Sequence, residues 1–110
     1  FETFVASELV KQQLGRGESR ALYYFRDEQG LEVDFIVPQA AGRVELIEAK
    51  YTKTPLPQMA KPIGVLLEKL KGRGIGTVVC RAAAGRPERA SIAPGVKAVS
   101  VEAMFAAALP

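Results

Sequence analysis

The sequence predicts a single α/β domain built on a mixed β-sheet, and three observations lead to this class. The chain has 110 residues, of which 48% are hydrophobic and 25% charged, so it can form one compact domain over residues 1–110 but not two. Three strand-like segments in succession, joined by short turns, predict an antiparallel meander. A helical pattern that leads directly into another apolar segment predicts a crossover to a parallel strand.

The periodicity of the apolar residues predicts the individual elements. Residues 1–14 form an amphipathic helical pattern with Phe4, Val5 and Leu9 on one side, and the glycines that follow end it. The next elements, in chain order, are strands over residues 21–26, 31–37 and 43–51 and a helix that begins at residue 58 or 62 and ends at 71. A strand over 75–81, a loop over 82–95, a strand over 96–100 and a helix over 101–109 complete the chain. We expect the aromatic run in the first strand to pack on the core. We also expect the strand after the second helix to pair in parallel with the third strand.

The composition excludes several classes of protein. There is no histidine and a single cysteine, Cys80, which excludes an internal disulfide, the usual Cys/His zinc sites and every nucleophile triad based on histidine. A net charge of +3 favours an anionic partner only weakly. No apolar stretch approaches the roughly 18 residues of a membrane span, and no signal-peptide pattern is present, so we expect a cytoplasmic protein without membrane contact. Any chemistry must therefore use carboxylates, Lys, Arg, Tyr or Ser.

Carboxylates occur in two strands where apolar residues are expected. Asp34 lies in the middle of a strand that carries apolar residues on both faces. In the next strand, the stripe that begins with Val44 and Leu46 continues at period two into Glu48 and Lys50. A buried carboxylate without a partner is strongly destabilising, so each acid needs a cation or strong hydrogen-bond donors. A hairpin would bring Asp34 beside Glu48, and Mg²⁺ or Mn²⁺ suits such a pair of oxygen ligands.

The first helix adds a third acid. On a helical wheel Glu8 lies at the centre of the apolar side, so we expect its carboxylate to point inward, toward the sheet. Asp34, Glu48 and Glu8 are therefore the candidate metal ligands. Phosphodiester hydrolysis needs charge neutralisation on the phosphate and an activated water, and a metal held by these acids would supply both. Lys50 is the candidate for orienting that water or stabilising charge on the phosphate.

These residues resemble the PD-(D/E)XK nuclease superfamily, also called restriction-endonuclease-like. A helix with Glu8 precedes a strand with Asp34, and the next strand carries Glu48-Ala49-Lys50 as the E-x-K half of the motif. The ordered set is much rarer by chance than the three-residue E-x-K pattern alone. Val33 stands before Asp34, where the family pattern has Pro. The resemblance implies that the two strand acids and the helix acid bind metal and that the lysine is catalytic.

The wider sequence is similar to the C-terminal domain, labelled as of unknown function, of a large group of prokaryotic AAA+ ATPases. The resemblance rests on FETFVASEL at residues 1–9, YYFR at 23–26, EVDFIV at 32–37 and IEAK at 47–50. It implies a restriction-endonuclease-like α/β/α sandwich with αβββαβ core order, a divalent metal and DNA as the substrate. It also implies a longer chain whose ATPase domain is a partner of this domain, because the chain has no G-x-x-x-x-G-K-[ST] motif of its own.

Two alternatives to a nuclease stay open at this point. The acids could form a buried structural ion cluster in which Lys50 pairs one acid and Arg26 the other. The domain could also be a catalytically silent DNA-binding or regulatory module of an AAA+ ATPase. If instead the acids crowd one another, Glu48→Gln should raise thermal stability in metal-free buffer by relieving their repulsion.

Basic residues outside this set have a weaker case. Tyr51 and Lys53 directly follow the E-x-K strand and are candidates for contacts to a phosphate backbone. Arg81, Arg86 and Arg89 are candidates for a basic rim. Solvated surface charge is the commoner role for such side chains.

Overall fold

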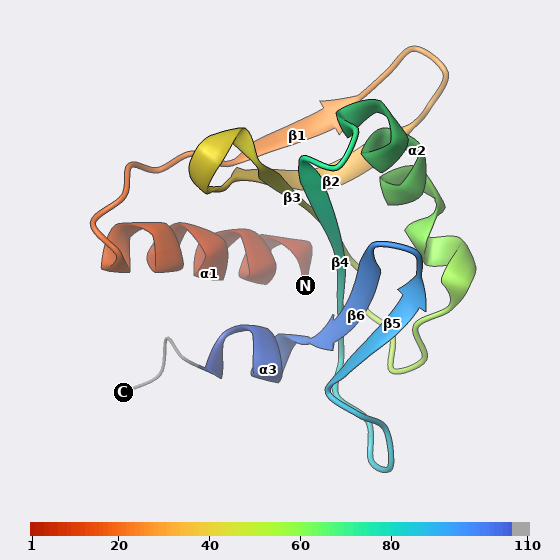
Figure 1. Ribbon diagram of the computed structural model, residues 1–110. Helices are drawn as coiled ribbons and strands as arrows, with labels where there is room; N and C mark the ends of the chain where they lie inside the picture. Colours follow the sequence, from red (N-terminus) through yellow and green to blue (C-terminus); the bar gives the residue numbers. More distant parts are fainter. Residues whose placement is uncertain (107–110) are drawn as a thin grey trace.

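The computed structural model of this chain describes residues 1–106. The chain folds into a six-stranded mixed β-sheet with helices on both faces (Figure 1). In chain order the elements are α1 (Glu2–Gly15), β1 (Tyr23–Arg26), β2 (Glu32–Pro38), β3 (Val44–Ala49), α2 (Lys61–Leu70), β4 (Gly74–Cys80), β5 (Arg89–Ala93), β6 (Val96–Ser100) and α3 (Val101–Met104). Short 3-10 turns span Ala40–Gly42 and Pro57–Ala60. The predicted mixed α/β class is confirmed.

The strands lie in the order β1-β2-β3-β4-β6-β5. β1, β2 and β3 form the predicted antiparallel meander, and β4 pairs in parallel with β3 as predicted. β6 is also parallel to β4. The carboxyl ends of β3, β4 and β6 therefore meet at one end of the sheet, and the residues that follow these strands lie side by side there.

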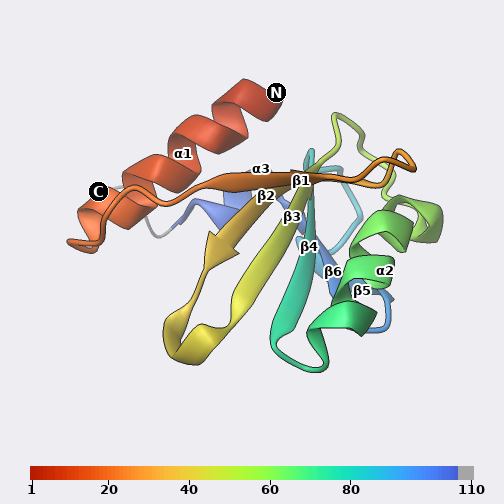
Figure 2. The same ribbon diagram turned by 90° about the horizontal axis from the view of Figure 1, so that it is seen from above.

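Helices lie on both faces of the sheet, α1 and α3 on one and α2 on the other (Figure 2), and a hydrophobic core lies on each face. On the face covered by α1 and α3 the buried residues are Val5, Leu9, Phe35, Val37, Ile47, Val79 and Phe105. On the face covered by α2 they are Val33, Leu46, Ala60, Ile63, Leu66, Val78 and Val96. Burial of this apolar surface, worth about 25 cal/mol per Å², holds α1 and α2 against the sheet.

The approach of α2 to β4 leaves no room for a side chain at Gly76. A Cβ atom built there would lie 2.5 Å from Ile63 Cγ2 and 3.0 Å from Val96 Cγ2. Atoms at 2.5 Å would overlap, and the dense packing of the interior leaves Ile63 little room to move away. The glycine is therefore required by the packing of helix on strand.

The segment predicted as a loop over residues 82–95 contains a strand, and this prediction was wrong. β5 pairs antiparallel with β6, and the register joins Ala93 to Val96 across a two-residue turn at Pro94 and Gly95. Gly95 has a φ of +74°, which glycine adopts readily in tight turns. The glycines and prolines of the segment obscured a short edge strand, since edge strands tolerate such neighbours.

The two terminal helices also differ in detail from the prediction. In α1 the buried residues are Val5, Leu9 and Gln13, whereas Phe4 is 52% exposed. α3 ends at Met104, and residues 107–109 of the predicted helix lie outside the described residues. None of the helices found within residues 1–106 has the length and apolar character needed to cross a lipid bilayer.

Candidate functional site

Asp34 and Glu48 lie where β2 and β3 separate. The regular pairing of these strands ends at Phe35 and Ile47, and the next backbone N–H groups donate to side chains. The Asp34 N–H donates to Glu48 Oε1 at 2.9 Å, and the Ala49 N–H donates to Asp34 Oδ2 at 2.9 Å. Each carboxylate thus accepts a hydrogen bond from the main chain of the other strand. We call Asp34 and Glu48 together the acid fork.

Lys50 reaches the acid fork from the solvent side. Its Nζ lies 3.2 Å from Glu48 Oε2, and its side chain is 42% exposed whereas that of Glu48 is 6% exposed. The Lys50 N–H donates to Val79 O at 2.8 Å, so the pairing with β4 continues past the end of β3 and fixes the backbone of the lysine. The structure therefore brings together three of the four predicted site residues, namely Asp34, Glu48 and Lys50.

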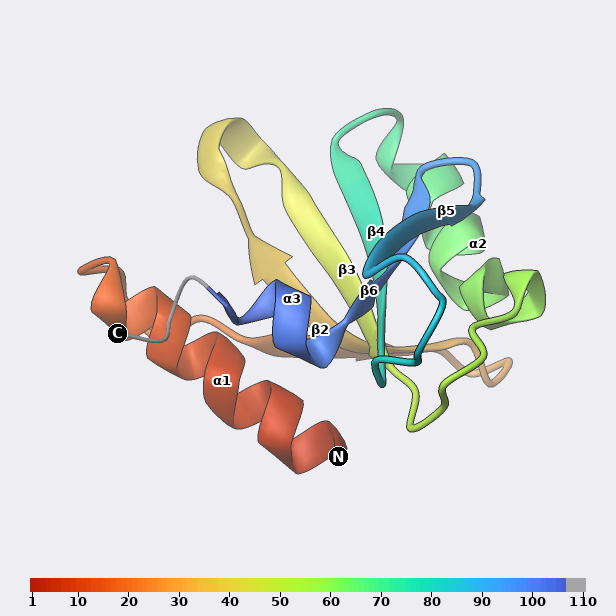
Figure 3. The ribbon, with the colours of Figure 1, turned by 90° about the horizontal axis from the view of Figure 1, so that it is seen from below.

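The helix acid at the fork is Glu2, which the sequence analysis missed. A hydrogen bond between its carboxyl and Asp34 is the main cause that raises the pKa of Glu2, followed by the charge of Asp34, burial and the charge of Glu48. Figure 3 shows the amino end of α1 at the same end of the sheet as the segment that follows β3. An acid in the first turn of a helix normally interacts favourably with the helix dipole. This ordinary role accounts for Glu2 in the sequence, so its contact with Asp34 could not be predicted.

Glu8, in contrast, does not join the other acids. Its carboxylate accepts a hydrogen bond from Lys11 Nζ at 3.4 Å within the same helix. Glu8 lies about 9 Å of helical rise beyond Glu2. The side of α1 that faces the sheet is defined by Val5, Leu9 and Gln13, which places Glu8 at the border of that side. Glu8 was expected to be the helix acid of the site. The helix acid that lies beside Asp34 is instead Glu2.

Burial leaves the acid fork with uncompensated negative charge. Desolvation is the largest influence on Glu48 and raises its pKa, and the charge of Asp34 raises it further. The hydrogen bond from the Asp34 N–H and the ammonium of Lys50 lower the pKa of Glu48, but the net direction is upward. The protein's own donors thus do not fully offset the cost of the buried charge, and a bound cation would reduce that cost.

A cleft of about 290 Å³ opens beside the fork, lined by Glu2 and Asp34 together with residues of β1 and β2. Tyr24 lines it and is 76% exposed, so the prediction that the aromatic run packs on the core was wrong for this residue and for Tyr23. Arg26 forms an ion pair with Glu32 on the rim of the cleft. The suggested pairing of Arg26 with a fork acid is therefore absent among residues 1–106.

The donor set suits a hard divalent cation with few protein ligands. Within residues 1–106 no group of three or more His, Cys, Asp or Glu side chains has the spacing of a complete metal cage. Mg²⁺ commonly takes only one or two carboxylates and keeps several waters. The Ala49 N–H occupies only the Oδ2 atom of Asp34, and Asp34 lines the cleft. The residues present thus fit a magnesium site of the carboxylate-and-water kind.

A model of the family described as "Domain of unknown function (DUF4143)" matches residues 1–103. The chain belongs to the DUF4143 family. The match includes Glu2, the acid fork and Lys50. No curated protein and no solved structure matches the chain. This family description names no chemistry, so the functional argument is built on the geometry of the fork.

Proposed function

We propose that this DUF4143 domain is a metal-dependent nuclease-like domain of the PD-(D/E)XK type, which hydrolyses phosphodiester bonds in DNA. In this proposal the fold is a restriction-endonuclease-like sandwich, and the domain is attached to an AAA+ ATPase. The observation that carries the proposal is the acid fork, in which Asp34 and Glu48 bond each other's strand and Lys50 lies 3.2 Å from Glu48.

Three acids, two on strands and one on α1, would hold the metal. Asp34 and Glu48 are the proposed ligands, and Glu2 takes the part that the sequence analysis gave to Glu8. The raised pKa values of the two acids support this assignment. Burial is the main cause for Glu48, whereas the hydrogen bond and charge of Asp34 are the main causes for Glu2. When bound, Mg²⁺ or Mn²⁺ supplies charge neutralisation at the phosphate and a water of lowered pKa.

Lys50 has a separate role in the proposal. Its ammonium is anchored by Glu48 at one side and remains partly exposed at the other, so it can donate hydrogen bonds to a phosphate oxygen or to an attacking water. The proposed catalytic residues are therefore Lys50 and the acids of the fork. Histidine is not needed for any of these roles.

A catalytically silent DNA-binding or regulatory module of an AAA+ ATPase is the second candidate, and one observation favours it. Both oxygens of Glu48 and one oxygen of Asp34 already have partners within the protein. Such a cluster can persist as a structural feature without a metal, as many buried ion pairs do.

The test is cleavage of DNA by the 110-residue chain in Mg²⁺ or Mn²⁺. We expect Asp34→Asn and Lys50→Met each to lower the rate about a hundredfold or more. Glu45→Gln is the matched control, because Glu45 is an acid of the same strand whose carboxylate accepts a bond from the Thr77 hydroxyl at 2.7 Å. Absence of any cleavage that depends on Asp34 would reject the nuclease. Calorimetry then distinguishes the remaining alternatives. Metal binding without cleavage indicates a catalytically silent metal site, and no binding at millimolar Mg²⁺ favours the regulatory module.

A further inference from the structure

A second pocket lies at the carboxyl ends of β4 and β6, outside the acid fork. It has a volume of about 190 Å³. The residues on which its chemistry depends are Lys53, Arg81, Arg86, Glu88, Cys80 and Ser100. Three cations face one carboxylate in this set. The pocket is therefore suited to an anion.

The cations of the pocket are available for a ligand, and one of them is held in place. Among residues 1–106, none of Lys53, Arg81 and Arg86 takes part in an ion pair. The Arg81 guanidinium lies over the ring of Tyr51, 4.4 Å from its centroid, and the Arg81 N–H donates to Thr52 O at 2.8 Å. Stacking on an aromatic ring leaves the edge of a guanidinium free to donate hydrogen bonds.

The inner wall of the pocket is neutral and offers a donor. Cys80 Sγ donates to Val99 O at 3.6 Å, and burial and the charge of Glu102 raise the pKa of this thiol, so it is uncharged at neutral pH. Ser100 is buried, and its Oγ accepts a bond from the Ala103 N–H at 3.1 Å. No residue in the described part of the chain accepts the Ser100 hydroxyl proton. This proton can be donated to a ligand.

The pocket and Glu48 of the acid fork lie on the same face of the sheet. Glu48 is in register with Val78, and Val78 is in register with Ala98, which lines the pocket. From β3 to β6 is two strand spacings, or about 10 Å. One short stretch of a nucleic-acid strand can therefore contact both sites, with the phosphate contact fixing its position.

We propose that this pocket binds a phosphate group of the nucleic-acid strand whose scissile bond lies at the acid fork. The inference rests on the proposed function and names a contact that sets where the strand is held. Arginine and lysine side chains together with a hydroxyl donor are the groups that bind phosphate oxygens in proteins. The phosphate is either the terminal monoester of a strand end or an internal diester, and the experiment separates these sources.

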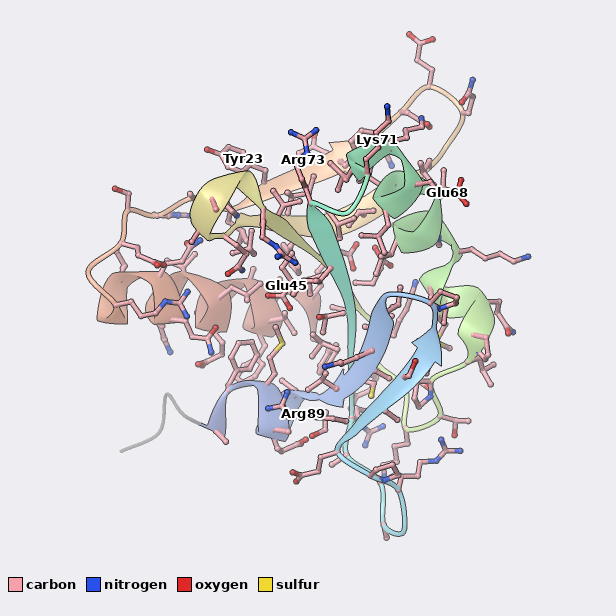
Figure 4. The ribbon with its side chains drawn as sticks, viewed as in Figure 1. Tyr23, Glu45, Glu68, Lys71, Arg73 and Arg89 are labelled. Carbon is pink, nitrogen blue, oxygen red and sulfur yellow. The ribbon has the colours of Figure 1, made fainter. Side chains whose placement is uncertain are left out.

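The experiment measures the affinity of the chain for a single-stranded DNA oligonucleotide labelled at its 3′ end, with a 5′-phosphate or a 5′-hydroxyl, by fluorescence anisotropy in EDTA and in Mg²⁺. Lys53→Gln and Arg86→Gln remove cations on exposed positions, and Glu88→Gln removes the carboxylate. Arg73→Gln is the matched control, because Arg73, labelled in Figure 4, directly precedes β4, whereas Arg81 directly follows it. Thermal melting verifies that each variant is folded.

We expect Lys53→Gln and Arg86→Gln each to weaken binding about tenfold and to reduce the salt slope by about one. Glu88→Gln should tighten binding, and Arg73→Gln should leave it unchanged. A terminal phosphate is indicated if the variants lose a preference for the 5′-phosphorylated oligonucleotide, and an internal phosphate if both oligonucleotides lose affinity equally.

The phosphate pocket is overturned if the pocket variants bind like the unmodified chain, or if the unmodified chain binds neither oligonucleotide. A third outcome is that binding depends on the pocket residues but no cleavage depends on Asp34. It would overturn the proposed hydrolysis and leave the phosphate pocket in place.

Discussion

Replacing Glu48 by Gln should raise the thermal stability of the metal-free protein. The side chain is 6% exposed, and the amide oxygen can still accept the bond from the Asp34 N–H. The change removes a desolvation cost of several kcal/mol per buried ion. Against this, it weakens one charge-assisted hydrogen bond and loses the Lys50 pair, worth roughly 1 kcal/mol each. Because the pKa of Glu48 is raised, the balance lies against the charge, and we expect a gain of about 1 kcal/mol, or roughly 4 °C in Tm.

Calorimetric melting in EDTA and in Mg²⁺ measures this effect. Glu28→Gln is the control, because Glu28 is an exposed acid in the turn between β1 and β2. Mg²⁺ should raise the Tm of the unmodified chain and of the control, and should have little effect on Glu48→Gln. A lower Tm for Glu48→Gln in EDTA would refute the reasoning, since it would mean that Lys50 and the Asp34 N–H stabilise the carboxylate beyond the cost of its burial.

Three further predictions concern the helices and the pH dependence. Gln13→Ala should cost about 2 kcal/mol in urea unfolding, because the Gln13 amide makes two bonds with the Ala21 backbone, at 2.7 and 3.1 Å, and a loss below about 0.5 kcal/mol would contradict this. Gly76→Ala should cost about 1–3 kcal/mol in the same measurement, owing to the overlap with α2, and an unchanged urea midpoint would show that the helix can move away. The pKa of Glu2 is raised in the folded state, so its contribution to stability falls as pH rises from about 4.5 toward neutrality. Glu2→Gln should therefore flatten the pH profile of the urea midpoint over this range relative to Glu8→Gln, and equal profiles would exclude the contact with Asp34.

The sheet and the acid fork could be predicted because their signals are local. The alternation of apolar residues in β2 and β3 is regular, and Asp34 and Glu48 interrupt it at positions that a short hairpin brings together. The crossover from α2 to β4 was equally predictable, since a short connection after a helix leaves few topologies.

The parts that were missed depend on contacts that the sequence does not encode locally. Phe4 and Val5 are equally apolar, so the helical wheel could not decide which of them faces the sheet, and an error in this rotation exchanged Glu8 for Glu2. The buried side of α1 is instead set partly by a polar residue, Gln13, through its bonds to the backbone of the following segment. Likewise, Arg89 donates to Ala103 O at 2.9 Å and so joins β5 to α3, whereas the sequence suggested a basic rim.

The reciprocal bonds of the acid fork affect how mutants of this family should be interpreted. Alanine scanning at Asp34 or Glu48 would delete a reacting group and release a neighbouring main-chain amide in the same substitution. A dead alanine mutant would then be compatible with lost chemistry and with a frayed hairpin alike. Amide replacements that keep the acceptor oxygen separate these two causes, and loss-of-function phenotypes in DUF4143 domains are best judged from such isosteric pairs.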